Sequence, residues 1–249
     1  MIALFRLLAL GLFILLWWVA SLLITRNLVP TPWATALAAV DLLRDGGLVR
    51  ATGETLGVYL SGYSIAAVVA IPFGVVIGSF RTLGRTLDPY INAFTATPRV
   101  AFVPLIIGLL GLGFNAKIAI VFLGAVMPIV INTYAGVVNA DGELIEMARS
   151  AGANRAQTFR RIVLPGSMPF IVAGLRLGAT IGLINTVVAE LYTAVRGLGG
   201  LLAVYGNTFR MPQYFVVVLT LALIGGVVSQ SLRFLESWME RWRYDGGEK

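Results

Sequence analysis

The chain has 249 residues, of which 58% are hydrophobic and only 12% charged, and its mean hydropathy of +0.86 predicts one helical membrane domain over residues 1–249. Neither histidine nor cysteine occurs, which excludes imidazole and thiolate metal sites, Cys or His nucleophiles and Ser-His-Asp triads. The net charge of +7 does not indicate nucleic-acid binding, because the basic residues are scattered between apolar segments.

Apolar runs predict six transmembrane helices. The first is interpreted as a retained span and not as a cleaved signal peptide, because no small-x-small cleavage site follows it. Residues 33–43 predict a short amphipathic helix at the membrane surface. A basic turn with Arg81 and Arg85 is expected after the second span, and a Gly-rich connection with a partial helix at residues 196–212. The six expected spans are residues 7–24, 55–80, 89–112, 118–138, 169–195 and 214–235.

The third span is the weakest of the six. Pro98, Arg99 and Pro104 interrupt it, and only residues 100–112 are continuously apolar. Lipid cannot satisfy the backbone groups that proline frees. A short, broken span is therefore expected to line a cavity or to be buried by neighbouring helices.

The basic residues favour one orientation in the membrane. Six spans put both termini and the long polar loop, residues 139–168, on the same side. Twelve Lys and Arg residues lie on that side and six on the other, which predicts that the termini and the loop are cytoplasmic. The twelve are Arg6, Arg81, Arg85, Arg99, Arg149, Arg155, Arg160, Arg161, Arg233, Arg241, Arg243 and Lys249; the six are Arg26, Arg44, Arg50, Lys117, Arg196 and Arg210.

The polar loop itself predicts two short helices. Asp141 suits the N-terminus of the first helix. Gly152 is expected to end it, because glycine adopts left-handed dihedral angles at little cost. The second helix is expected over residues 153–163, with its end at Pro165.

Two short helices at an angle would form a knob that projects from the bilayer. One interpretation is that the knob fills a groove on a partner, with Met147, Ala148 and Ala151 as its apolar face and Glu146 and Arg149 as polar anchors. The other is an interfacial loop whose arginines contact phospholipid headgroups. The residues alone favour neither interpretation.

A family resemblance favours the first interpretation. The loop resembles the docking loop of ABC-importer permeases, with the signature Glu-Ala-Ala, three residues, Gly, nine residues, Ile-x-Leu-Pro. Met147 replaces the first alanine, an apolar exchange that enlarges the contact. Residues 132–136, 174–176 and 188–190 are similar to the nitrate/sulfonate/taurine/bicarbonate branch. The matching signature positions are Glu146, Ala148, Gly152, Ile162, Leu164 and Pro165.

The resemblance implies the permease subunit of a type I ABC importer, an all-α membrane protein with six transmembrane helices and a cytoplasmic coupling-helix loop. It implies a multi-pass protein of the bacterial inner (plasma) membrane. The implied solute is a small organic or inorganic anion such as a sulfonate or nitrate. The residues implied to dock the ATPase are Glu146, Met147, Ala148, Arg149, Ala151, Gly152, Ile162, Leu164 and Pro165.

Partners follow from the same resemblance. The chain lacks a Gly-x-x-x-x-Gly-Lys-Ser/Thr phosphate loop, so it is expected to be non-catalytic, with ATP and Mg bound by partners. The implied partners are two cytoplasmic ATPase subunits, a second permease copy that completes a homodimer, a periplasmic or lipid-anchored substrate-binding protein, and the lipid bilayer.

Small residues form one stripe along the fifth span. The stripe predicts either close helix packing or the lining of a pathway or dimer interface, with Asn185 and Thr186 as donors to the solute. Its members are Gly174, Gly178, Gly182, Asn185 and Ala189. Glu190 is placed near the outer boundary of the membrane, where it has either a structural role at the helix end or a role in gating.

Two other functions make different predictions for the sequence. An ion-gradient-driven secondary transporter predicts several ionisable residues deep in the spans, whereas only Glu190 and Arg176 were recognised, both near span ends. A non-transport membrane scaffold leaves the loop signature without a role.

Overall fold

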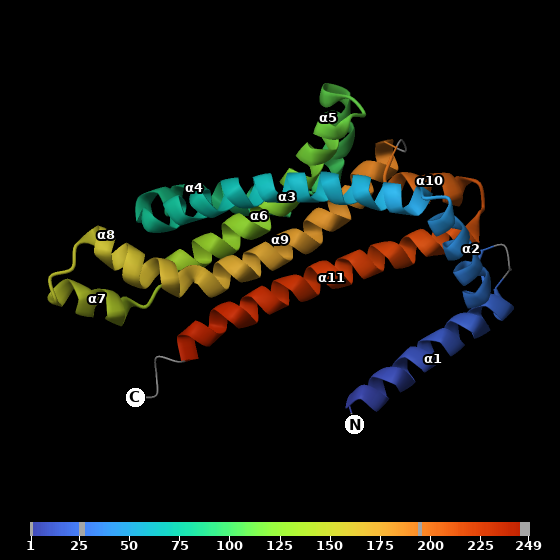
Figure 1. Cartoon of the computed structure of the whole chain (residues 1–249). Coiled ribbons are helices and arrows are strands. Elements are labelled where there is room, and N and C mark those ends of the chain that lie inside the picture. Colours follow the sequence, from blue (N-terminus) through green and yellow to red (C-terminus); the bar gives the residue numbers. More distant parts are fainter. Residues whose placement is uncertain (1, 25–27, 194–195, 245–249) are drawn as a thin grey trace. The chain divides into compact units, whose positions relative to one another are not determined.

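The computed structural model describes residues 2–24, 28–193 and 196–244, and every regular element in these ranges is helical (Figure 1). Arg26, Lys249 and the expected end of the fifth span at Val195 lie outside the described residues. The elements are α1 (Ile2–Leu23), α2 (Pro32–Arg44), α3 (Gly47–Ser79), α4 (Arg81–Ala96), η1 (Arg99–Phe102), α5 (Val103–Leu110), α6 (Phe114–Val138), α7 (Gly142–Ser150), α8 (Arg155–Thr158), η2 (Phe159–Val163), α9 (Leu164–Thr193), α10 (Leu198–Asn207) and α11 (Met211–Tyr244).

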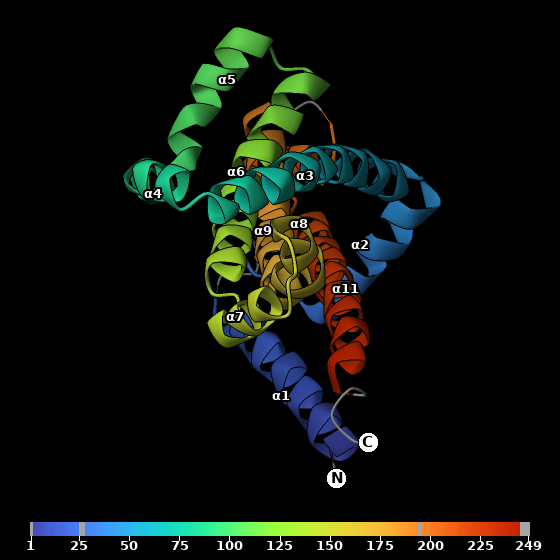
Figure 2. The same ribbon diagram turned by 90° about the vertical axis from the view of Figure 1, so that its left-hand side faces the viewer.

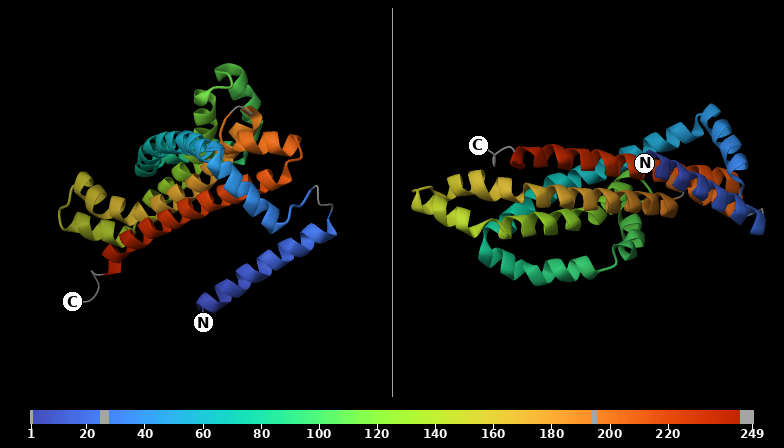
Figure 3. Two further views of the ribbon diagram at one scale, coloured as in Figure 1. Left: turned by 45° about the vertical axis from the view of Figure 1, so that its right-hand side comes forward. Right: turned by 90° about the horizontal axis from the view of Figure 1, so that it is seen from below.

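Five helical segments in the described ranges are long and apolar enough to cross a membrane: Leu4–Leu23, Gly47–Ser79, Phe114–Val138, Arg155–Thr193 and Met211–Phe234. A sixth is obtained if Arg81–Ala96 and Arg99–Leu110, which are bent by 80° at their junction, count as one broken span. Figure 3 shows this bend between α4 and α5. The all-α fold with up to six spans therefore agrees with the sequence prediction.

The chain divides into two compact units. One unit comprises residues 1–57 and 190–224, and the other comprises residues 58–189 and 225–249. In the first unit, α2 begins as its sequence dictates, because Thr31 caps the N-terminus and Pro32 occupies the first turn. Trp17 of α1 stacks on Phe215 of α11, with ring centroids 5.7 Å apart, and donates from Nε1 to the Pro30 carbonyl at 3.0 Å.

Helix α6 is the centre of the second unit, packed between α3 and α9 (Figure 2). Its neighbours approach through glycines. A β-carbon on Gly74 of α3 would lie 2.7 Å from Thr133 Cβ, and one on Gly178 of α9 would lie 2.7 Å from Ile129 Cγ1. Such small-residue contacts let helix backbones approach closely where no hydrophobic effect drives association. The second unit is thus held by two tight helix seams on α6.

Three expectations about the elements are wrong. Arg81 and Arg85 do not lie in a turn but in α4, which continues until Pro98 pushes the preceding Thr97 into an extended conformation. The second span begins at Gly47, earlier than expected. Pro165 does not end a helix, because helical residues run without interruption from Arg155 to Thr193.

Candidate functional site

The polar loop folds into a hairpin of α7 and α8, which lie in contact at one end of the second unit (Figure 1). Asp141 caps α7, since its Oδ1 accepts from the N–H groups of Glu143 (2.9 Å) and Leu144 (3.3 Å). Asn154 and Gln157 form a capping box at the start of α8, with reciprocal bonds of 2.9 and 2.8 Å. The helix start at Asp141 is confirmed, whereas the capping box was not anticipated.

Gly152 ends α7 as the sequence predicted. Its φ of +81° lies in the left-handed region, and its N–H donates to the Arg149 carbonyl at 2.9 Å. The Ala153 N–H donates to the Ala148 carbonyl, also at 2.9 Å. These two bonds make a Schellman motif, which closes the helix and turns the chain sharply toward α8. Space around Gly152 is open, so its backbone conformation alone accounts for the need for glycine.

The signature residues divide into an exposed and a half-buried set. Glu146, Met147, Arg149, Ala151, Gly152 and Pro165 are exposed, whereas Ala148, Ile162 and Leu164 are half-buried. Met147 is 63% exposed, and Leu144, three residues earlier on the same helix face, is 43% exposed. Leu144 was missed in the sequence, although its spacing from Met147 indicated a shared face. The hairpin therefore offers an apolar surface with a charged residue on either side of Met147.

A π turn joins the hairpin to α9. The N–H of Leu164 donates to the carbonyl of Phe159, five residues back, and the turn spans Phe159–Val163. The helix accommodates Pro165 directly after this turn. The second half of the signature thus belongs to a continuous helical segment that enters the predicted membrane region.

The small-residue stripe on α9 lies against α6 of the same chain. Gly178 contacts Ile129, and the Asn185 side chain lies on Gly124, where an added β-carbon would be 2.6 Å from Asn185 Cγ. Gly182 and Thr186 are also buried, and Thr186 donates to the Gly182 carbonyl at 2.9 Å. The close-packing interpretation therefore describes the stripe in this conformation, and a role in a dimer interface stays a prediction without a supporting contact.

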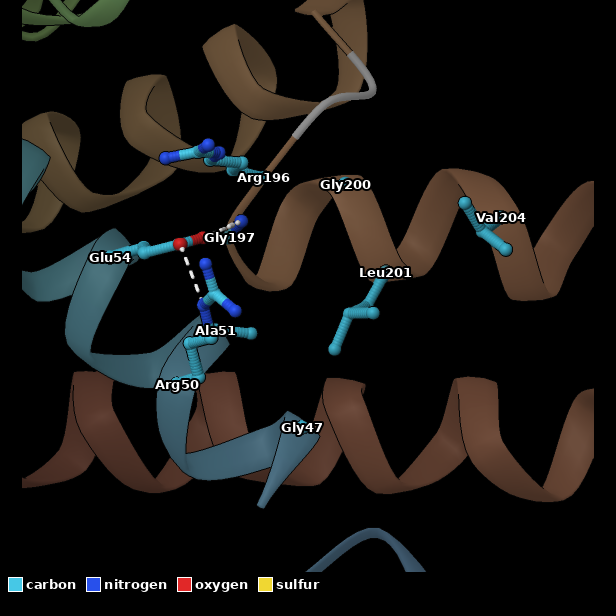
Figure 4. Close-up of a pocket in the computed structure, with 9 residues that line it drawn as sticks. All are labelled: Gly47, Arg50, Ala51, Glu54, Arg196, Gly197, Gly200, Leu201 and Val204. Carbon is cyan, nitrogen blue, oxygen red and sulfur yellow. Dashed lines mark hydrogen bonds and ion pairs between the residues drawn. The ribbon is translucent and has the colours of Figure 1, made fainter. Parts of the chain in front are cut away.

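A further polar cluster in the first unit surrounds the N-terminus of α10. Gly197, the N-cap residue, offers no side chain, and its N–H donates to Glu54 Oε2 at 3.0 Å (Figure 4). Glu54 also pairs with Arg50, one turn earlier on α3, at 3.4 Å. These residues line a cavity of about 290 Å³. Side chains of α3 therefore supply the cap that α10 lacks.

Glu190 is fully buried beside this cap. Its carboxyl oxygens accept from Thr55 Oγ1 at 3.0 and 2.9 Å, and Oε2 also accepts from the Gly199 N–H at 2.9 Å. Thr55 Oγ1 in turn accepts from the Leu198 N–H at 2.8 Å. Thr55 and Glu190 thus accept from the first N–H groups of α10, which have no partner within their own helix. A carboxyl group is favourable at a helix N-terminus. The contacts agree with a structural role for Glu190, and its partner Thr55 gave no sequence signal.

Comparison with known proteins places these features in context. Residues 70–243 match the family described as binding-protein-dependent transport system inner membrane component. The taurine transport system permease protein TauC of Escherichia coli (strain K12) is 31% identical over 233 residues, which cover 91% of this chain and 85% of the relative. A permease of the same strain named for aliphatic sulfonate transport is 32% identical over 88% and 83% of the two chains. The riboflavin transport system permease protein RibX of Chloroflexus aurantiacus is 33% identical over 86% and 80%.

Solved structures agree at the level of the fold. An inward-facing conformation of the MetNI methionine ABC transporter matches with a TM-score of 0.66 and 21% identity, over 78% of this chain and 96% of that chain. An amino acid ABC transporter matches with a TM-score of 0.61 and 20% identity, over 83% and 96%.

Proposed function

Since this chain belongs to the family of binding-protein-dependent transport system inner membrane components, we propose that it forms half of a homodimeric pathway for a small anion, driven by two cytoplasmic ATPase subunits. The importer class decides against an ion-gradient-driven transporter and against a scaffold. The finer statements, which concern the docking surface, the stoichiometry, the orientation and the solute, are proposals.

The α7–α8 hairpin is the proposed docking surface for the ATPase. The observation that carries this proposal is the exposure of Glu146, Met147 and Arg149 on α7, held by a Schellman turn at Gly152 that fixes the hairpin. An apolar side chain between two charged ones suits insertion into a groove with a polar rim. The described residues form one such hairpin, whereas two ATPase subunits are expected to act together, so we expect two permease copies.

The proposed mechanism is alternating access. Closure of the ATPase pair on ATP moves the α7–α8 hairpin, and the continuous helix Arg155–Thr193 carries that movement toward the membrane-spanning part of the chain. ATP and Mg are bound by the ATPase partners. A periplasmic or lipid-anchored binding protein delivers the solute to the opposite face. The hairpin and both termini are accordingly cytoplasmic.

A small anion is the proposed solute. Relatives named for taurine and aliphatic sulfonate transport support a sulfonate, nitrate or similar ion, while the relative named for riboflavin provides a specific alternative. A ligand screen of the purified partner binding protein distinguishes them. Binding of a sulfonate or nitrate supports the proposal, and binding of riboflavin alone replaces it.

Cross-linking tests the docking surface directly, because the chain has no native cysteine. We expect Met147→Cys, labelled with a photoreactive maleimide, to cross-link the ATPase subunit in the assembled complex. Tyr90→Cys on α4 is the matched control, since Tyr90 is 71% exposed and lies outside the hairpin. Equal cross-linking of the ATPase from both positions, or from neither, would rule out the hairpin as its docking surface.

A further inference from the structure

The broken span α4–α5 brings a charged side chain to the middle of another helix. The helices are bent by 80° where residues 97 and 98 separate them, and Arg99 is the first residue after the break. Arg99 Nη1 donates to the Gly124 carbonyl of α6 at 2.9 Å. At a rise of about 1.5 Å per residue, Gly124 lies roughly 15 Å from the start of α6 and roughly 21 Å from its end. Arg99, which the count of basic residues assigned to the cytoplasmic side, therefore contacts α6 near the middle of that helix.

The Gly124 carbonyl is free for this contact because of a proline. In a helix it would accept from the N–H of residue 128, but Pro128 has none. One N–H of Arg99 fills that position. A guanidinium has five N–H donors, and the described residues provide no carboxyl partner for the other donors of Arg99. Within the part of the chain that the structure describes, Arg99 is thus anchored through one donor and has no carboxylate counter-ion.

Asn185 of α9 reaches the same residue from another element. Its Cβ would lie 3.1 Å from a β-carbon placed on Gly124, so only glycine leaves room for it. Its Nδ2 is held by the Ile181 carbonyl at 2.8 Å. Arg99 and Asn185 therefore converge on Gly124 from a broken span and an intact one. Discontinuous helices and unmatched charges near mid-depth are typical of solute-binding positions in transporters.

We propose that Arg99 and Asn185 form an anion-binding subsite of the transport pathway. Arg99 is a half-buried residue whose guanidinium presents a planar set of donors that fits two oxygens of a sulfonate or nitrate group, and the buried Asn185 packs on the same glycine of α6. The inference rests on the proposed import of a small anion. It adds the residues that recognise the anion within the membrane.

The test uses the complete importer, with ATPases and binding protein, in proteoliposomes. Uptake of labelled taurine, 1-butanesulfonate, nitrate and riboflavin is measured together with ATP hydrolysis. For Arg99→Gln we expect the amount of sulfonate or nitrate moved per ATP to fall about 10- to 100-fold, as loss of a charged hydrogen-bond donor implies. Arg99→Lys should retain more anion uptake per ATP than Arg99→Gln. Arg85→Gln on α4, an exposed arginine, is the matched control and should stay within about twofold of wild type.

Charge rescue separates recognition from folding. Arg99→Cys in this cysteine-free chain should regain anion uptake when an aminoethyl methanethiosulfonate restores the positive charge, but not when the sulfonatoethyl reagent adds a negative one. Unchanged uptake per ATP in Arg99→Gln would overturn the subsite, as would a parallel loss of uptake and ATP hydrolysis that no charged group restores. Wild-type uptake of riboflavin alone would overturn it too and leave the importer assignment intact. Uptake that does not depend on ATP would instead overturn the proposed function.

Discussion

The Thr55 hydroxyl donates to both carboxyl oxygens of Glu190, at 3.0 and 2.9 Å, across a sequence separation of 135 residues. This pair and the Gly199 N–H hold the start of α10 against the ends of α3 and α9. Both residues are fully buried, so water cannot replace a lost bond without a change in packing.

Removal of the Thr55 hydroxyl should destabilise the first unit. Thr55→Val keeps the side-chain volume but removes the hydroxyl that donates to Glu190 and accepts from the Leu198 N–H, at a cost of about 1–3 kcal/mol. Thr52→Val, one turn earlier on α3, is the control, because the half-buried Thr52 lines an apolar groove. The check is the midpoint of thermal unfolding in detergent. Equal midpoints for the two variants would show that the Thr55–Glu190 bond contributes little.

Gly152→Ala should weaken the docking hairpin through its backbone alone. The left-handed conformation costs an L-residue about 1–2 kcal/mol, although no atom obstructs the new methyl group. Gly142→Ala is the matched control, since Gly142 is equally open, has no positive φ and begins α7. We expect co-purification of the ATPase to fall for Gly152→Ala and not for Gly142→Ala. Loss in both, or in neither, would contradict a specific role of the Schellman turn.

Two glycines of the α9 stripe should differ in their tolerance of alanine. A β-carbon on Gly178 would lie 2.7 Å from Ile129 Cγ1 and 3.0 Å from the Ala125 carbonyl oxygen, so α6 and α9 must separate. Overpacking of this kind costs about 1–3 kcal/mol. A β-carbon on Gly182 would make ordinary contacts at 3.5 Å. The midpoint of thermal unfolding should fall clearly for Gly178→Ala and change little for Gly182→Ala. The reverse order would mean that α6 and α9 are not packed as described.

The proposed orientation predicts opposite labelling of two exposed positions. Asn154, in the hairpin, should be cytoplasmic, and Asn207, at the end of α10, should face the periplasm. Single cysteines at these positions are labelled in intact cells with a membrane-impermeant maleimide, which should react only at position 207. Reaction at both positions, or at position 154 alone, would contradict the proposed topology.

Local patterns were sufficient to predict most of the membrane-spanning helices and the turn at Gly152. Long apolar runs, an acidic N-cap at Asp141 and a single glycine each act within a few residues. Pro165 misled for a related reason, since a proline usually marks a helix end, and here a helix with a π turn continues through it. The basic residues Arg81 and Arg85 likewise predict a turn, whereas the structure has a helix that continues through Pro89 to Ala96.

Contacts between distant segments were not predictable in the same way. Thr55 has no local feature that distinguishes it from Thr52, the other threonine of α3, and its role arises only when Glu190 and the start of α10 reach it. Arg99 was counted with the cytoplasmic residues although it interrupts the third expected span, and the 80° break brings it onto α6. In both cases tertiary structure, and not sequence spacing, determines what a polar side chain contacts.

The π turn at Phe159–Val163 also sets the rotational phase of α9. Such a turn accommodates one extra residue, and each residue of an α-helix corresponds to a rotation of about 100°. If the turn were drawn out into regular α-helix, the hairpin would rotate by that angle relative to the face of α9 that carries Gly178 and Asn185. A change from π to α hydrogen bonding at residues 159–163 would therefore rotate the hairpin by a large angle about the axis of α9.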